Sequence, residues 1–269
     1  MMTEKIQPLL MQSPLGLLFD IDGTLSPIAP TPDEARLYTG VEKLLRQASA
    51  YAHVGIITGR AVKDGARLVD VDGLTYIGTH GLEWSDGLPE THPIQLLPEA
   101  LPYVEPGKEL LDLVESHLTE FPGVIVQRKN VGGSIHYRLA PEPEQTRERL
   151  LALLREPAQR LQMRLGEGKR VVEVLAPLKI NKGHALRRYV NHFGLRSVLF
   201  AGDDRTDLDA ILEIETLRQE GYTALSIVVQ HQDTLPALLE HGDIIVQEVE
   251  GMVQLFERIV AGLHQQEKA

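Results

Sequence analysis

The chain has 269 residues, of which 43% are hydrophobic and 24% charged, a balance typical of one large globular domain or two smaller ones. Its formal net charge of −11 disfavours nucleic acid, itself a polyanion, as a partner. The absence of cysteine excludes disulfides, thiolate nucleophiles and sulfur-bound zinc, so any metal must be held by oxygen or imidazole.

The sequence carries no membrane signal. Its longest uninterrupted apolar runs are about as long as a strand, far below the roughly 20 residues that a membrane-spanning helix needs. The first 14 residues lack the basic segment, long apolar stretch and small-residue cleavage site of a signal peptide. We therefore expect a cytoplasmic protein without a membrane partner.

Apolar strand patterns alternate with amphipathic helix patterns in the first and last thirds of the chain. Strands are expected at 15–20, 54–60, 74–81, 196–204, 224–230 and 243–249. Helices are expected at 39–51, 61–69, 182–194 and 253–263. This alternation is typical of the α/β class, with a Rossmann-like parallel sheet between two layers of helices.

The middle of the chain has a different pattern. It predicts a helix at 107–121, strands at 124–130 and 134–140, a second helix at 143–160, and strands at 161–165 and 170–176. The order α-β-β-α-β-β indicates an α+β sheet with helices on one side. We expect residues 103–177 to form a second domain inserted into a core made of residues 1–102 and 178–269.

Two carboxylates follow the first strand directly, in LLFDIDGTLSP at residues 17–27. Ligands of parallel α/β sheets bind beyond the carboxyl ends of the strands. The other strands that end in polar groups are followed by Thr58 and Arg60, by His80 and Glu83, and by Asp203 to Asp207. A near copy, VDVDGLT at 69–75, precedes its strand instead, so it is expected at the opposite edge as a polar turn.

Several carboxylates at one sheet edge need a cation to remain ionised. They are Asp20, Asp22, Asp203, Asp204 and Asp207. Hard oxygen ligands in a cysteine-free chain favour Mg²⁺, and Mg²⁺ usually accompanies a phosphate. A hydroxyl from Thr58 and an ammonium from Lys182 would help to neutralise phosphoryl oxygens.

These residues resemble a known superfamily. The segments DIDGTL, Thr58, Lys182 and GDDRTD (202–207) match, in order and approximate spacing, the four motifs of the haloacid-dehalogenase-like (HAD) phosphatases, and the inserted segment resembles a cap domain of that superfamily. Further motifs are similar to those of the trehalose-6-phosphate phosphatases: GTHGLE, QRKNVGGSIHYR, GKRVVEV, NKG and GDDRTDLDA. The resemblance covers roughly residues 15–260.

The resemblance implies a role for each core residue. Asp20 would be the nucleophile that forms an aspartyl-phosphate, and Asp22 the general acid and base. Mg²⁺ would be held by the carboxylates of Asp20 and Asp203 and by the backbone carbonyl of Asp22.

The remaining core residues would assist these groups. Asp204 and Asp207 would act through ordered water or by orienting Lys182. Thr58 and Lys182 would hold the phosphoryl oxygens.

The resemblance also implies sugar contacts. The residues expected to bind substrate are Gly59, Arg60, His80, Glu83, Arg128, Lys129, His136, Arg138, Lys169 and Glu173. Glu173 is carried over most directly. An equally good explanation is that a solvated sheet face carries Arg128, Lys129 and Arg138. An alternative for His80 and Glu83 is that they fix their loop. Trp84 is expected to pack in the core.

The function implied is Mg²⁺-dependent hydrolysis of trehalose 6-phosphate to trehalose and phosphate, with a functional link to a trehalose-6-phosphate synthase. Two alternatives remain open. One is a phosphatase of another glycosyl phosphate, such as mannosyl-3-phosphoglycerate, sucrose 6-phosphate or glucosylglycerol phosphate; the other is a catalytically silent sugar-phosphate sensor. The chain has Ala176 where the family often has an arginine before the proline, so one cationic contact is missing.

Overall fold

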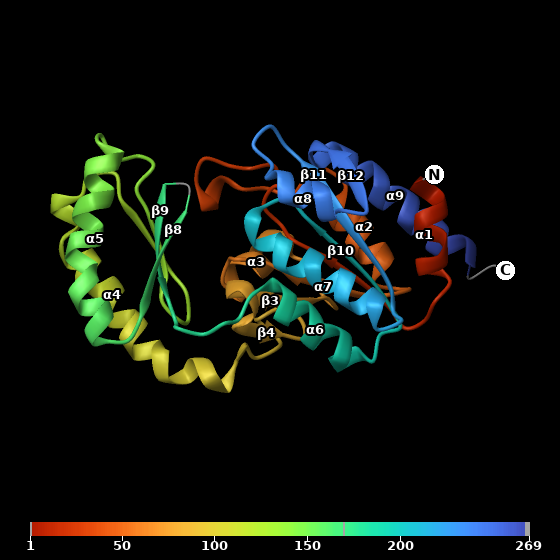
Figure 1. Ribbon diagram of the computed structural model, residues 1–269, viewed down its shortest axis with the longest axis horizontal. Coiled ribbons are helices and arrows are strands. Elements are labelled where there is room, and N and C mark those ends of the chain that lie inside the picture. The colour runs from red at the N-terminus through yellow and green to blue at the C-terminus, as the bar shows by residue number, and fades with distance from the viewer. Residues whose placement is uncertain (1, 169, 267–269) are drawn as a thin grey trace. The chain divides into compact units, whose positions relative to one another are not determined.

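The computed structural model describes residues 2–168 and 170–266, which divide into two compact units. The first consists of Met1–Gln95 and Ile180–Ala269, and the second is Leu96–Lys179 (Figure 1). The second unit begins before the expected residue 103, because the 3-10 helix η3 (Pro98–Tyr103) leads directly into the first helix of that unit.

The first unit is built on an eight-stranded sheet of order β12-β11-β10-β1-β2-β3-β4-β5. The strands are β1 (Leu15–Phe19), β2 (His53–Ile57), β3 (Thr75–Gly78), β4 (Glu83–Ser85), β5 (Gln95–Leu96), β10 (Ser197–Gly202), β11 (Thr223–Gln230) and β12 (Ile244–Gln247). Neighbours from β12 to β3 pair in parallel, and β4 returns antiparallel to β3. The expected α/β parallel sheet is confirmed.

Helices cover both faces of this sheet, which explains why all five residues of β1 are apolar or glycine and buried. One face packs against α1 (Met2–Leu10), α2 (Val41–Ala48), α3 (Val62–Val69) and α9 (Glu248–Gln266). The other packs against α6 (Lys182–Phe193), α7 (Leu208–Gln219) and α8 (Pro236–His241). The alternation of side chains along β1 divides it between the two cores, since Phe19 belongs to the first and Leu18 to the second.

The second unit is a four-stranded antiparallel sheet of order β6-β7-β9-β8 with two helices. Its elements are α4 (Val104–Ser116), β6 (Ile125–Arg128), β7 (Gly133–His136), α5 (Pro143–Arg160), β8 (Arg164–Gly168) and β9 (Val171–Leu175). Both helices pack on one face, where Ile135, Val172 and Val174 join their apolar side chains in a single core. The opposite face, which we call the helix-free face, presents the alternate residues of each strand.

Some elements differ from those expected. Three helices were not predicted: α1, which contains Pro8, α7, and α8, which is only a short turn beginning at Pro236. The strand expected at 161–165 begins later as β8, since α5 continues to Arg160 despite its internal Pro157. Within the part of the chain that the structure describes, no helix is both long and apolar enough to cross a bilayer.

Candidate active site

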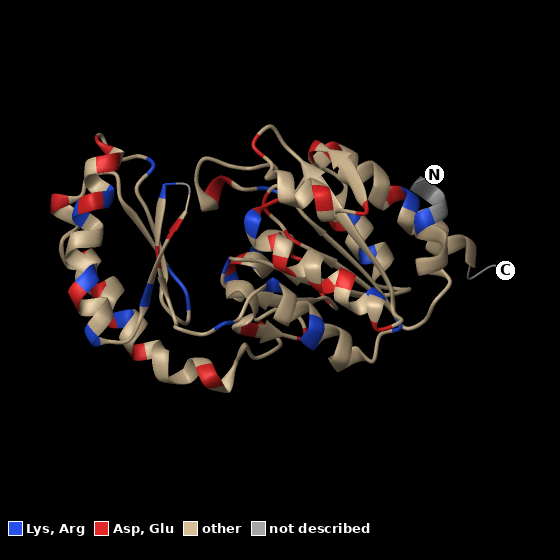
Figure 2. Cartoon of the chain, viewed as in Figure 1, with Lys and Arg blue, Asp and Glu red and all other residues tan. Residues whose placement is uncertain are grey.

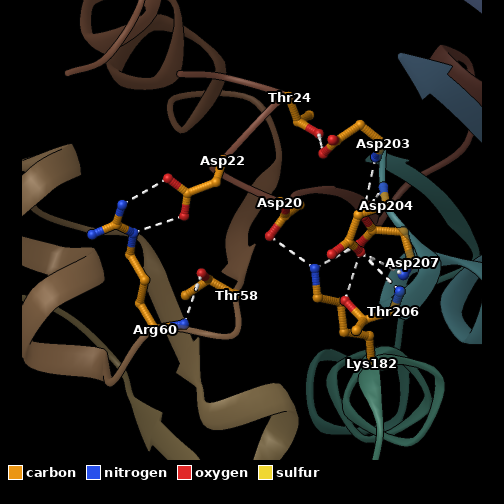
Figure 3. Close-up of polar contacts among 10 residues, drawn as sticks. All are labelled: Asp20, Asp22, Thr24, Thr58, Arg60, Lys182, Asp203, Asp204, Thr206 and Asp207. Carbon is orange, nitrogen blue, oxygen red and sulfur yellow. Dashed lines mark hydrogen bonds and ion pairs between the residues drawn. The ribbon is translucent and has the colours of Figure 1, made fainter. Parts of the chain in front are cut away.

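The polar residues expected at the carboxyl edge of the parallel sheet come together around β1 and β10. The two strands are paired in register up to Phe19 and Ala201, and the Asp20 N–H donates to the Ala201 carbonyl at 2.9 Å. Asp20 and Asp203 are each the first residue after their strand. Their side chains are therefore brought to the same point of the sheet edge (Figure 3).

Lys182 lies between two of the carboxylates. Its Nζ is 2.8 Å from Asp20 Oδ1 and 2.7 Å from Asp207 Oδ1, and the side chain is 2% exposed. It is the first residue of α6, whose start is fixed by Asn181, because the Asn181 side chain accepts the His184 N–H. Burial alone would lower the pKa of Lys182, but Asp20 and Asp207 outweigh it and hold the pKa well above its usual range.

The segment after β10 is organised by Asp207. Its Oδ2 accepts the backbone N–H groups of Asp203 and Asp204, both at 3.0 Å, while its Oδ1 accepts from Lys182. Asp204 in turn caps the 3-10 helix η5 (Arg205–Asp207) by accepting the Thr206 N–H at 2.8 Å. Of the two expected roles for Asp207, orientation of Lys182 is the one that these contacts support.

Thr24 ties the DxDGT segment to Asp203. Its hydroxyl donates to Asp203 Oδ1 at 3.1 Å. Gly23 has a φ of +88°, and a Cβ at this position would lie 2.1 Å from Asp203 Oδ2, so only glycine fits. In the near copy, Gly73 has open space around it and Asp70 ends α3 before β3 begins, which makes that segment the polar turn expected.

The carboxylate cluster fits a divalent cation. Oxygens of Asp20, Asp203 and Asp207 all lie within 4.8 Å of one another. Burial, together with the neighbouring carboxylates, raises the pKa of Asp20 to about 7 and that of Asp203 to about 8, even though Lys182 opposes the shift. The ionised cluster is therefore short of positive charge, and its oxygen-only ligands suit Mg²⁺.

Asp22 has a different partner from Asp20. Arg60 donates from Nε to Asp22 Oδ2 and from Nη2 to Asp22 Oδ1, both at 2.7 Å, a bidentate ion pair (Figure 3). The bound Asp22 holds the pKa of Arg60 above its usual value against the effect of burial. Thr58, directly after β2, is 2% exposed and accepts the Arg60 N–H through its Oγ1 at 3.1 Å.

The loop after β3 is held by Glu83. This carboxylate is fully buried and accepts the Val62 N–H at 2.7 Å and the Thr79 hydroxyl at 2.8 Å. These bonds support the alternative in which Glu83 fixes its loop. The His80 ring lies against Gly59, where a Cβ would be 2.7 Å from its Cε1.

Trp84 packs in the core, as expected. It is 2% exposed, Arg188 lies 4.7 Å from its ring centroid, and its Nε1 donates to Asp86 at 2.6 Å.

The sheet of the second unit separates Arg128 from Lys129, although the two residues are adjacent in the sequence. Arg128 lies on the helix side of its sheet, where it donates to Glu115 of α4 at 2.9 and 2.7 Å and also pairs with Asp112. Charged residues of both signs occur along α4 and α5 (Figure 2). Arg128 is therefore part of an exposed charge network with α4, which supports neither the sugar contact nor the simple solvated face that the sequence suggested.

The helix-free face carries the other polar candidates. Glu173 alternates with the core residues Val172 and Val174, and its carboxylate is 3.7 Å from Lys129 Nζ. His136 Nε2 is 3.1 Å from Gln127 Oε1. Arg138 is exposed beyond the end of β7, and Lys169 lies outside the described residues.

A family model described as trehalose-phosphatase matches residues 18–236. The chain belongs to the trehalose-phosphatase family. This confirms the resemblance drawn from the motifs. The trehalose-phosphate phosphatases of Mycobacterium marinum and Mycobacterium tuberculosis are each 31% identical to it over 226 residues, which are 81% of this chain and 54% of the relative. The chain thus spans about half the length of these curated relatives.

Solved structures agree with the trehalose-phosphatase fold. A trehalose-6-phosphate phosphatase related protein is 24% identical with a TM-score of 0.78, over 93% of this chain and 99% of that chain. The C-terminal domain of the C. albicans trehalose-6-phosphate phosphatase is 19% identical with a TM-score of 0.74, over 95% and 96%. A haloacid dehalogenase-like hydrolase from Bacteroides thetaiotaomicron is 14% identical with a TM-score of 0.61, over 91% and 98%. The HAD-like fold is confirmed.

Two features of this candidate site were not predicted from the sequence. The Asp22–Arg60 pair joins residues in the loops after two different strands, β1 and β2, and no local pattern indicates it. His231, whose Nε2 is 2.7 Å from the Gly23 carbonyl, follows β11 directly. Its position after a parallel strand at the ligand edge was the signal available for it.

Proposed function

We propose that this chain hydrolyses trehalose 6-phosphate to trehalose and inorganic phosphate, with Mg²⁺ and through an aspartyl-phosphate intermediate. The observation that carries the proposal is the buried Asp20–Lys182–Asp207 arrangement at the carboxyl ends of β1 and β10, in a chain of the trehalose-phosphatase family. A carboxylate paired with a buried cation, at the edge where parallel sheets bind ligands, suits attack on an anionic phosphate.

In the first step, an Asp20 oxygen would form a bond to phosphorus while the bond from phosphorus to the sugar oxygen breaks. The leaving oxygen would take a proton from Asp22. Lys182 and Thr58 would stabilise the phosphoryl oxygens, which is supported by the burial of both side chains and by the contact of Lys182 with Asp20. Trehalose would then leave the site.

In the second step, water would attack phosphorus and break the bond to Asp20, releasing phosphate. Asp22 would accept the proton from this water. Both Asp22 oxygens accept hydrogen bonds from Arg60, which suits an ionised general base. We expect Asp22 to leave Arg60 when it carries the proton, because a protonated carboxyl has lost one of these two acceptors.

Mg²⁺ would be held by the carboxylates of Asp20 and Asp203 and by the backbone carbonyl of Asp22. When bound, the ion would neutralise the negative charge that nucleophile and phosphate bring together. Asp207 would orient Lys182, since its oxygens accept hydrogen bonds from Lys182 and from the backbone N–H groups of Asp203 and Asp204.

The helix-free face of the second unit would supply the sugar contacts. Lys129 and Glu173 offer an ammonium and a carboxylate side by side, and His136 with Gln127 adds a second polar pair. Hydroxyl groups of a disaccharide are both donors and acceptors, so such pairs can bind them in a bidentate way. Gly166, the neighbour of Glu173 on β8, leaves one side of this carboxylate without a side chain.

The test is a panel of phosphate esters compared by kcat/KM: trehalose 6-phosphate, sucrose 6-phosphate, mannosyl-3-phosphoglycerate and glucosylglycerol phosphate. Trehalose 6-phosphate should give the highest value. If another ester gives a higher value, that ester is the substrate instead. Ala176, which stands where the family often has an arginine, gives a specific reason to test for this. Tight binding of the esters without phosphate release would instead indicate a sensor.

One further expectation belongs to this proposal. We infer a functional link to a trehalose-6-phosphate synthase, the type of enzyme that would supply the substrate.

A further inference from the structure

His231 connects the DxDGT segment to the start of the last helix. It lies in the loop between β11 and α8, outside the four motifs of the sequence. Its Nε2 is 2.7 Å from the Gly23 carbonyl oxygen, and its Nδ1 is 2.7 Å from Glu248 Oε2. Both partners are hydrogen-bond acceptors, and each ring nitrogen lies within hydrogen-bond distance of one of them. The ring thus bridges two elements that are far apart in the sequence.

The His231 ring is itself fixed. Its side chain is 11% exposed, and its backbone N–H donates to Thr234 Oγ1 at 2.7 Å. The contact with Glu248 completes this arrangement. A side chain restrained at its backbone and at both ring nitrogens can hold its partners in one position, as the outer residues of metal sites do.

Gly23 is the residue through which this contact reaches the carboxylate cluster. Gly23 is the next residue after Asp22 in the chain. Its N–H donates to the Ser26 carbonyl at 2.7 Å, and its Cα packs against Asp203. His231 Nε2 is also 3.8 Å from Asp203 Oδ2. A displacement of the Gly23 peptide would therefore move the backbone of Asp22 and disturb Asp203.

Glu248 has a strained backbone. Its φ is +54°, in the left-handed region that residues with a Cβ rarely adopt. Such strain persists where the surrounding structure holds it, and it concentrates at functional positions. The residue directly follows β12 as the first residue of α9, and its side chain reaches His231 from there.

We propose that His231 and Glu248 are positioning residues for the phosphatase reaction: Glu248 orients the His231 imidazole, which anchors the Gly23 carbonyl and so keeps the Asp20–Asp22 backbone in place beside Asp203. This inference rests on the proposed phosphatase function. Neither side chain touches the substrate in this role. Their effect reaches the reaction through the backbone of the DxDGT segment.

The test compares two variants of His231 with a matched control. His231→Ala removes both hydrogen bonds, whereas the amide of His231→Gln can still donate to Gly23. The control is His241→Ala. His241, on α8, also pairs with a glutamate, since its Nδ1 is 2.9 Å from Glu215 Oε1. With trehalose 6-phosphate, His231→Ala should lower kcat about 10-fold or more with little change in KM, since outer residues of metal sites have effects of this size. His231→Gln should recover part of the loss, and the control should match the unmodified protein.

A Glu248 variant separates positioning from stability. Glu248→Gly removes the carboxylate, so kcat should fall. The same change relieves the positive φ, so the unfolding midpoint should not fall. Mg²⁺ binding measured by calorimetry without substrate should weaken about 10-fold in His231→Ala. The proposal is overturned if His231→Ala keeps both kcat and Mg²⁺ affinity within about twofold, or if His241→Ala loses as much. If the unmodified protein hydrolyses no ester, the phosphatase function fails, and the Mg²⁺ titration alone then decides the positioning role.

Discussion

Asp20 and Asp22 stand one residue apart and yet have opposite environments. Asp20 is buried beside Lys182 and Asp207, whereas Asp22 pairs with Arg60. In an extended backbone, side chains two residues apart point in the same direction, so Asp20 and Asp22 would share one environment. The sharp turn after Asp20 prevents this. The two carboxylates are thereby separated: Asp20 joins the carboxylate cluster beside Lys182, and Asp22 joins an ion pair with Arg60.

The exchange Asp20→Asn tests the nucleophile. The amide has nearly the same shape but cannot attack phosphorus, so phosphate release should fall at least about 10³-fold. Circular dichroism and a cooperative thermal transition should show that the fold is kept. Near-normal phosphate release from this variant would refute the mechanism.

A second residue-scale prediction compares Glu173→Ala with Arg128→Ala. Glu173 lies on the helix-free face, and its loss should lower kcat/KM for trehalose 6-phosphate about 10- to 100-fold, the effect of losing a charged hydrogen bond. Hydrolysis of p-nitrophenyl phosphate, which has no sugar, should not change.

Arg128→Ala provides the matched control, since its ion pairs with Glu115 and Asp112 are exposed and lie on the helix side. It should cost about 1 kcal/mol of unfolding free energy or less and leave both activities unchanged. Equal losses on both esters from Glu173→Ala would show that Glu173 does not bind the sugar.

At the level of elements, the turn after β1 is built differently from its near copy before β3. Gly23 and Gly73 both have positive φ values, +88° and +77°, but only Gly23 is packed against a carboxylate. The same short motif therefore forms a crowded loop at the candidate site in one place and an open turn in the other.

Gly23→Ala and Gly73→Ala turn this difference into a prediction. Both should lose about 1–2 kcal/mol of unfolding free energy from the left-handed backbone, and Gly23→Ala should lose more, because its Cβ would also clash with Asp203. Only Gly23→Ala should also lose activity, about 100-fold, because its Cβ would displace Asp203 by a distance that matters for catalysis. Urea unfolding and kcat for p-nitrophenyl phosphate measure the two effects. Activity losses of equal size in the two variants would contradict this explanation.

The elements also show what could be predicted from the sequence. Asp20, Thr58 and Asp203 each follow an apolar run that local pattern identifies as a strand, and parallel pairing brings them to one edge. The side of the sheet that Arg128 occupies could not be predicted, because QRKN is a continuous polar run without alternation. The contact of His231 with Gly23 depends on tertiary packing between distant segments, which local patterns do not contain.

At the scale of the whole molecule, we expect the buried cluster to make stability depend on pH and on Mg²⁺. Burial raises the pKa of Asp20 to about 7 and that of Asp203 to about 8 in the metal-free protein, whereas both carboxyls titrate near 3.8 when exposed. Between about pH 4 and pH 8 the folded state therefore binds more protons than the unfolded state. Under this linkage, stability decreases as pH rises through that range.

The melting temperature of the metal-free protein should thus fall by at least a few degrees between pH 5 and pH 8. Mg²⁺ competes with protons for the same carboxylates, so it should raise the melting temperature more at pH 8 than at pH 5. Asp20→Asn removes one of the raised carboxyls, and it should reduce both the pH slope and the Mg²⁺ effect relative to the unmodified chain. A metal-free melting temperature that stays level or rises from pH 5 to pH 8 would mean that these carboxyls are not held protonated, and that the cluster is compensated without a divalent ion.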